Sequence, residues 1–128
     1  MDIADEIRKL VDDFTGCHLA LYADISSKMV LICKSQTPTP QEMQDNLCFE
    51  AAAMFDGQPA RLNEAGSPTT AIVATDAGVK LFVRQSPDAS DVLCCLCEPG
   101  IDIQMLVSAA RAKLALIAPT AETEPTPI

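Results

Sequence analysis

Short polar turns divide much of this sequence into apolar, strand-like runs, and this pattern constrains the fold more than any other feature. Asp24-Ile25-Ser26-Ser27 separates the first two runs, and Asp76-Ala77-Gly78 separates the third from the fourth. Turns this short join neighbouring strands that run antiparallel. The runs span residues 17–24, 28–34, 69–75, 79–84 and 91–97. The sequence therefore predicts an antiparallel sheet built from a pair of strands and a later group of three.

The distribution of apolar residues along these runs predicts how the sheet is covered. The first two runs are apolar on both faces, which is typical of strands packed between two layers. In residues 79–84, apolar side chains alternate with a second set that contains Lys80 and Arg84. This alternation predicts that the fourth strand is only half buried within a single chain.

Three amphipathic segments predict the helices that cover the sheet. Thr39, Pro40 and Glu42 match a helix start with Thr39 as the N-cap, and Gly57-Gln58-Pro59 ends this segment. Apolar residues also recur at helical spacing over residues 3–14 and 103–117. The three apolar stripes consist of Ile3, Ile7, Leu10, Val11 and Phe14; of Met43, Leu47, Ala51, Met54 and Phe55; and of Ile103, Leu106, Val107, Ala110, Leu114 and Ile117.

The resulting order is helix, two strands, helix, three strands and helix, αββαβββα, which places the chain in the α+β class. We expect one domain at residues 1–118. Residues 119–128 are rich in Pro, Thr and Glu and are predicted to form a disordered C-terminal tail.

This succession resembles the roadblock/dynein light chain family, in particular its bacterial members. The resemblance rests on the opening amphipathic segment 3–14, the run Leu19-Ala-Leu-Tyr-Ala-Asp24, the hairpin from Ala71 to Val83 and the closing run 93–97. It implies a five-stranded antiparallel sheet flanked by three helices, with the first and last helices on one face and the second on the other. It also implies a homodimer formed along the third strand and the second helix.

The resemblance further implies a function in protein–protein contact, since bacterial members resemble regulators or scaffolds for small Ras-like GTPases. Carried onto this sequence, the dimer surface comprises Thr70, Ile72 and Ala74 on the third strand with Asn46 and Glu50 on the second helix. Residues 69–75 contain no Lys, Arg or Pro to block strand pairing, which favours the same surface on physical grounds. The alternative is that residues 61–68 cover this edge.

Composition argues against several other partners. The net charge of −9 disfavours nucleic acid and anionic membranes, which proteins bind through Lys and Arg. One Tyr, four Phe and no Trp leave few rings on which bases could stack. We expect no membrane insertion, since the apolar stretches are far shorter than about 18 residues. The acidic start does not match a secretory signal, so we predict a cytoplasmic protein with six reduced cysteines.

The densest chemical feature is Cys94-Cys95-Leu96-Cys97. On a strand, Cys95 and Cys97 face one way and Cys94 the other. In the arrangement that the resemblance implies, Cys17 and Cys33 could approach Cys95 or Cys97. Zinc needs about four ligands in a tetrahedral array, and no pair of metal-binding knuckles is present. Because free cysteine commonly packs as a small apolar side chain, core packing is favoured over metal or redox chemistry.

The sequence contains no motif for catalysis or nucleotide binding. His18, the only histidine, has no accompanying nucleophile motif, and neither a P-loop nor a dinucleotide-binding glycine pattern occurs. We therefore predict a protein that is not an enzyme and has no catalytic residue, cofactor or metal. Its predicted function is that of a homodimeric interaction module for a small Ras-like GTPase or its complex. The alternative is a PAS, GAF or profilin-like sensor that binds a small ligand or metal through His18, Tyr22 and the cysteines.

Overall fold

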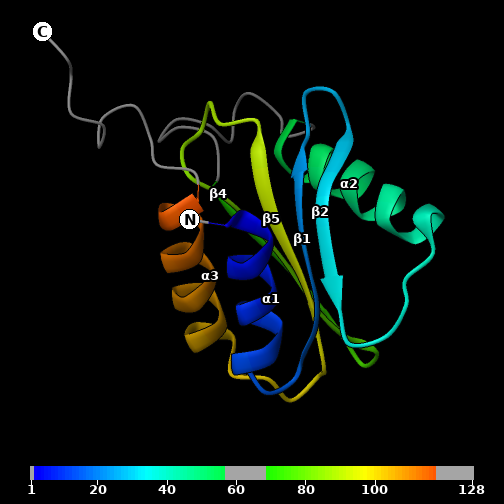
Figure 1. Cartoon of the computed structure of the whole chain (residues 1–128), viewed down its shortest axis with the longest axis vertical. Coiled ribbons are helices and arrows are strands. Elements are labelled where there is room, and N and C mark those ends of the chain that lie inside the picture. The colour runs from blue at the N-terminus through cyan, green and yellow to red at the C-terminus, as the bar shows by residue number, and fades with distance from the viewer. Residues whose placement is uncertain (1, 57–68, 118–128) are drawn as a thin grey trace, which may run out of the picture.

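The computed structural model describes residues 2–56 and 69–117, which form one antiparallel sheet with helices on both faces (Figure 1). In chain order the elements are α1 (Ile3–Asp13), β1 (Cys17–Asp24), β2 (Met29–Ser35), α2 (Gln41–Asp56), β3 (Thr70–Thr75), β4 (Gly78–Arg84), β5 (Asp91–Cys97) and α3 (Ile103–Ile117). This order, αββαβββα, confirms the predicted fold class. The predicted tail, residues 119–128, and the segment 61–68 lie outside the described residues.

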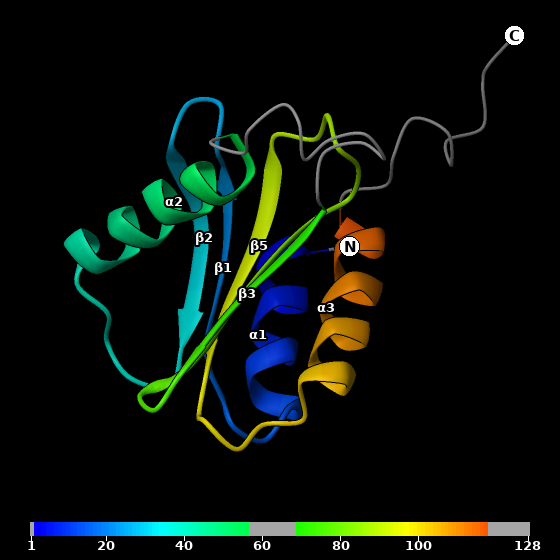
Figure 2. The same ribbon diagram turned by 180° about the vertical axis from the view of Figure 1, so that it is seen from behind.

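The sheet has the strand order β2-β1-β5-β4-β3, and each neighbouring pair is antiparallel. β1 and β5 are far apart in sequence but pair at the centre, from Cys17 opposite Cys97 to Asp24 opposite Asp91. β2 and β3 are the edges of the described sheet. Figures 1 and 2 show α1 and α3 side by side on one face and α2 across the other. Both features agree with the arrangement that the sequence resemblance implies.

Each face of the sheet carries its own hydrophobic core. On one face, the predicted stripes of α1 and α3 pack against strand residues such as Leu81 and Leu93. On the other face, α2 packs against strand residues such as Leu21 and Phe82. Burying one large apolar side chain completely contributes about 1.5–3 kcal/mol, so both cores are needed for the stability of a domain this small.

The prediction that the fourth strand is half buried is wrong for β4. On the α2 face, Phe82 is completely buried and Arg84 is only 3% exposed. The guanidinium carbon of Arg84 lies 4.4 Å from the centre of the Phe55 ring on α2. The Phe55 ring shields the Arg84 guanidinium, which the alternating sequence pattern alone would place in solvent. β4 therefore packs between two layers along most of its length.

The N-terminus of α2 also differs from the predicted capping box. The helix begins at Gln41, and the Pro40 carbonyl accepts its first backbone hydrogen bonds. The Thr39 hydroxyl lies 2.9 Å from the Ser35 hydroxyl and donates to the Thr37 carbonyl. Thr39 thus ties the start of α2 to the end of β2.

Gly78 allows β4 to begin directly beside β5. A Cβ at this position would lie 2.5 Å from the carbonyl oxygen of Cys97, closer than real Cβ contacts come. The tight turn between β3 and β4 therefore requires glycine.

An ion pair joins α1 to α3. Lys113 Nζ lies 2.9 Å from Glu6 Oε1, and Lys9 Nζ lies 3.3 Å from the other oxygen of the same carboxylate. The Glu6 and Lys113 side chains are largely shielded from solvent by the helices around them. The hydrogen bond from Lys113 is the main reason that the pKa of Glu6 is lower than usual.

We predict that Glu6→Gln destabilises the protein at neutral pH and that the difference from the wild type becomes smaller in acid. A carboxylate whose pKa is lowered by folding stabilises the folded state above its unfolded-state pKa. That contribution is lost as the pH falls through the folded-state pKa. Urea unfolding of both proteins at pH 7 and at about pH 3, below the ordinary Glu pKa of about 4.3, measures the effect. Asp12→Asn, at an exposed position of the same helix, is the control; an equal difference at both pH values would contradict the prediction.

Candidate interaction surface

β3 is an edge strand whose outer side is open in the described part of the molecule. It pairs with β4 from Thr70 opposite Val83 to Thr75 opposite Gly78, and no described strand pairs with its other side. The strand contains no charged residue and no Pro. An edge with unpaired backbone N–H and C=O groups and no charge to repel a second strand is a template for pairing.

The three strand residues predicted for the dimer surface, Thr70, Ile72 and Ala74, share the face that α1 and α3 cover. Ile72 is opposite Leu81, whose side chain belongs to the core of that face. Leu81 is completely buried, but Ile72 is 43% exposed, because α3 reaches β4 and leaves the outer strand partly open. Ala74 is exposed as well. Apolar side chains therefore border the open edge on this face.

The two helix residues predicted for the same surface, Asn46 and Glu50, belong to α2 on the opposite face. Asn46 is exposed on the outer side of the helix. The Glu50 carboxylate accepts a hydrogen bond from Lys80 Nζ at 3.1 Å, and Lys80 is opposite Val73 of β3. The structure therefore does not gather the five residues in one patch: the two groups lie on opposite faces, and Glu50 comes near β3 through Lys80.

The outer side of α2 carries exposed apolar residues that the sequence reasoning missed. Phe49 is 50% exposed and Met43 is 48% exposed. The prediction that Met43 belongs to the buried stripe is wrong. The side of α2 that is buried consists of Leu47, Cys48, Ala51, Ala52 and Phe55. Exposed Phe and Met side chains on one helix are typical of protein contact surfaces.

A pocket of about 400 Å³ lies on the α2 face of the sheet, near the turn between β3 and β4. α2 packs over β1, β2 and β5 and leaves this part of the face open. His18, one of the predicted sensor residues, lines the pocket, with Nδ1 3.4 Å from Gln36 Oε1. The other lining residues are Val73, Thr75, Ala77, Gly78, Val79, Lys80, Leu96 and Cys97.

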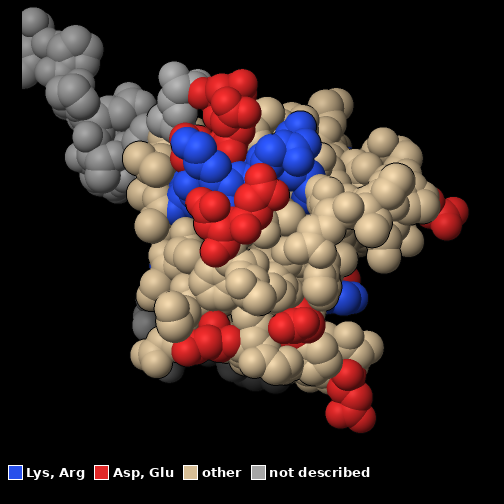
Figure 3. Space-filling view, turned by 60° about the horizontal axis from the view of Figure 1, so that its bottom comes forward, with Lys and Arg blue, Asp and Glu red and all other residues tan. Residues whose placement is uncertain are grey.

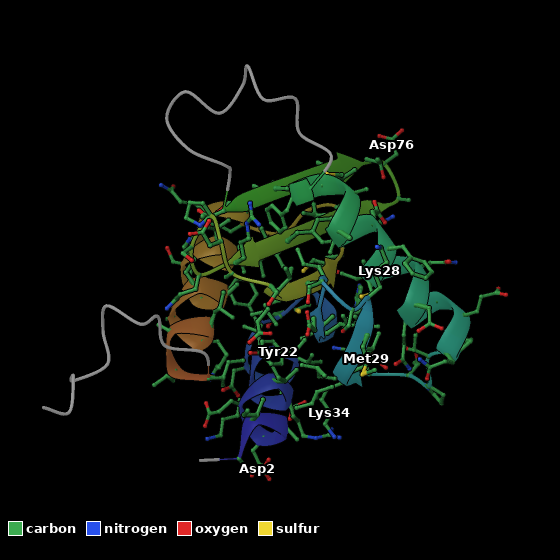
Figure 4. All side chains as sticks on the ribbon, turned by 90° about the horizontal axis from the view of Figure 1, so that it is seen from above. Asp2, Tyr22, Lys28, Met29, Lys34 and Asp76 are labelled. Carbon is green, nitrogen blue, oxygen red and sulfur yellow. The ribbon has the colours of Figure 1, made fainter. Side chains whose placement is uncertain are left out.

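Tyr22, a second predicted sensor residue, does not line this pocket. It belongs to the core under α1 and α3, and Figure 4 shows it in the interior. Its hydroxyl donates a hydrogen bond to Asp91 Oδ2 at 2.8 Å. Burial, followed by this hydrogen bond, raises the pKa of Tyr22. The structure thus separates Tyr22 from His18.

The six thiols divide between the two faces of the sheet. As predicted, Cys95 and Cys97 share one face and Cys94 lies on the other. Cys17 packs in the same core as Cys95 and Cys97, where its thiol donates to the Leu19 carbonyl at 3.6 Å. Cys33 packs on the α2 face with Cys48 and Cys94. Within residues 2–56 and 69–117, no group of three or more His, Cys, Asp and Glu side chains is arranged to hold a metal ion.

Surface charge is mixed on the side of the molecule seen in Figure 3. Lys and Arg side chains lie there among Asp and Glu rather than in a separate basic patch. Nucleic-acid sites concentrate positive charge, and this side does not. No helix in the described ranges is long and apolar enough to cross a membrane.

The chain has the fold of roadblock domains. No protein-family model matches the sequence, and no curated protein matches it in sequence. Solved structures do match. The Roadblock/LC7 domain from Streptomyces avermitilis has a TM-score of 0.78 at 16% identity, over 96% of this chain and 100% of that one. Myxococcus xanthus MglB has a TM-score of 0.69 at 13% identity, over 90% of this chain and 93% of that one. An MglB structure with a tetrameric arrangement has a TM-score of 0.72 at 14% identity, over 94% of this chain and 88% of that one.

Arg111 of α3 fixes the point where β3 begins. Its guanidinium donates to the hydroxyls of Thr69, at 2.7 Å, and Thr70, and to the Arg84 carbonyl at 3.5 Å. The Arg84 N–H in turn donates to the Thr69 carbonyl at 2.9 Å. The start of the candidate edge is therefore tied to α3 as well as to β4.

We predict that Arg111→Met loosens the start of β3 without unfolding the domain. Hydrogen bonds from a charged group contribute about 1.5–3 kcal/mol, so the Arg84 amide should exchange its hydrogen about tenfold faster or more. Hydrogen exchange followed by NMR measures this rate. Lys113→Met, on the same helix, removes the contact with Glu6 and is the matched control. Equal Arg84 exchange in the two variants would contradict the assigned role of Arg111.

Proposed function

We propose that this chain is a protein-interaction module, not an enzyme, that forms a homodimer through the β3 edge and the outer side of α2. The supporting observation is the combination of an open, uncharged edge strand with exposed apolar side chains at Ile72, Phe49 and Met43. Antiparallel pairing of β3 with its copy would make one sheet continuous across two subunits.

Two contributions would stabilise such a dimer. Strand pairing satisfies backbone N–H and C=O groups that otherwise face water, and it provides register. Burial of the exposed apolar side chains adds about 25 cal/mol for each Å² removed from water. Because the chain is acidic, pairing many of its other segments with their own copies would bring like charges together. β3 carries no charge, so pairing it with its copy places no like charges opposite each other.

We further propose that the partner of this dimer is a small Ras-like GTPase or a regulator of one, in the cytoplasm. The roadblock fold and the resemblance to bacterial roadblock proteins support this partner class. The similarity in fold to an MglB structure with a tetrameric arrangement supports assembly through protein contacts. The chain has no P-loop of its own, which is consistent with a partner of a nucleotide-binding protein.

A second candidate function is a sensor of a small ligand. The pocket of about 400 Å³ beside His18 favours it, because ligand sites are concave and largely apolar with a few polar groups. Native mass spectrometry of the purified full-length protein separates the two functions. A dimer without added mass supports the interaction module, and a retained small molecule supports the sensor.

We predict that Ile72→Lys weakens the dimer by about 30-fold, which corresponds to about 2 kcal/mol. The substitution brings a charge, and in a self-paired edge two like charges, to the contact. Sedimentation equilibrium of the full-length protein measures the dissociation constant. Met29→Lys is the matched control, since Met29 is an apolar residue that is 57% exposed on the other edge strand, β2 (Figure 4). Loss of the dimer in Met29→Lys alone would show that the wrong edge is assigned.

The partner class is tested by titrating the dimer with a small Ras-like GTPase from the same organism in a calorimeter. The GTPase is loaded in turn with GDP and with a GTP analogue that is not hydrolysed. Saturable binding of either form supports the proposal, and an absence of heat with both forms of every such GTPase contradicts it.

A further inference from the structure

A cluster of three thiols in the α1/α3 core has no role in the dimer surface. Cys17 lies at the start of β1, and Cys95 and Cys97 lie near the end of β5. All three are buried in the same core, where the Cys17 thiol donates to the Leu19 carbonyl at 3.6 Å. Three thiols in one small core are also a chemical group, because oxidation can join two of them.

The sheet register selects one pair from this cluster. Cys17 is directly opposite Cys97, whereas Cys95 is opposite Ala20. Directly opposite residues of an antiparallel pair have Cα atoms about 4.5–5.5 Å apart, which is inside the range of disulfides. Diagonal neighbours are about 7–8 Å apart, beyond that range. The β1–β5 register shifts between Cys17 and Leu19, and Cys17 and Cys97 remain partners on the strand-end side of that shift. The pairing therefore places Cys97, rather than Cys95, directly across from Cys17.

Cys97 is the member of the cluster closest to solvent. Its side chain is 4% exposed, against 0% for Cys17 and 1% for Cys95. Both residues of the pair lie at the end of their strand, and just beyond them the Glu98 N–H donates to the Gly16 carbonyl at 2.9 Å. Because strand ends open at a lower free-energy cost than the middle of a sheet, local opening of this end is the route by which an oxidant would reach the sulfurs.

The thiols of the two faces differ in their ionisation. The neighbouring Cys95 and Cys97 thiols lower the pKa of Cys17. On the α2 face, burial raises the pKa values of Cys33, Cys48 and Cys94. Since the thiolate is the form that reacts with oxidants, this difference favours Cys17 as the thiol that reacts first.

We propose that Cys17 and Cys97 form a reversible disulfide when the protein meets a peroxide, and that this bond ties the start of β1 to the end of β5. The Cys17 sulfur attacks one oxygen of hydrogen peroxide, the O–O bond breaks, and the departing hydroxide takes up the thiol proton as water. The sulfenic acid on Cys17 is then attacked by the Cys97 sulfur. The S–S bond forms as the S–O bond breaks, and the second oxygen leaves as water with the Cys97 proton. Peroxide gains two electrons, one from each sulfur.

The test uses full-length protein and an equimolar amount of hydrogen peroxide. After the reaction, remaining thiols are blocked with N-ethylmaleimide in denaturant, and the protein is digested without reductant. Tandem mass spectrometry then locates the blocked and the linked cysteines. We expect a link between Cys17 and Cys97, with the other four cysteines blocked, and we expect dithiothreitol to remove it. A link through Cys95, a link among the α2-face thiols, a link between chains or no link at all would overturn the proposal.

A pair of variants on the same strand provides the control. Cys97→Ser should lower the yield of Cys17 cross-link at least tenfold, whereas Cys94→Ser, at an equally buried position on the other face, should leave it unchanged. Equal yields in the two variants would also overturn the proposal. The location of the link in the wild-type protein stands independently of whether either variant folds.

Discussion

The rest of the structure depends on the pairing of β1 with β5. This pairing joins an N-terminal unit, α1-β1-β2, to the later strands and α3, and it forms the centre of the sheet. Each of the two strands contributes side chains to both cores, so α1 and α3 on one face and α2 on the other have their binding sites only when the pair exists. Because its partners are distant in sequence, it is also the contact with the highest loop-closure cost.

The central pair also decides which strands are left at the edges, and the two edges differ. β2 carries a register irregularity opposite Tyr22 and Ala23, follows directly on Lys28 and contains Lys34. Bulges and lysines are devices that discourage pairing with a second chain. β3 pairs with β4 in uninterrupted register and has no charge. The difference supports β3, rather than β2, as the edge used for assembly.

Most of the fold could be predicted from sequence because periodicity and turns are local signals. The helix stripes and the strand runs lie within a few residues of their observed bounds. The errors arose where a tertiary contact overrides the local pattern. Arg84 is buried because Phe55 of a different element covers it. Met43 is exposed because α2 crosses the sheet without covering it fully, so the first turn of the helix has no strand beneath it to pack on.

The candidate surface was harder to predict than the fold, for the same reason. Sequence alternation places Thr70, Ile72 and Ala74 on one face of a strand, but it cannot state which helix covers that face. The pairing of Ile72 with Leu81 shows that this is the face covered by α1 and α3. Asn46 and Glu50 of α2 therefore lie on the opposite face of the sheet. Phe49 had a detectable signal, since Leu47, Cys48 and Phe49 are three consecutive apolar residues that span about 200° of a helix, too wide for all three to face one core.

The two proposed activities use separate parts of the sheet. Val73 and Thr75 of the open edge form part of the wall of the pocket on the α2 face, so a second copy that pairs with β3 would lie beside them and narrow the mouth of the pocket. The Cys17 and Cys97 side chains belong to the core under α1 and α3 instead. β4 also lies between β3 and β5, so pairing at the β3 edge would leave the strand ends that carry the two thiols as they are. Assembly at the edge and oxidation at the centre of the sheet would therefore act independently.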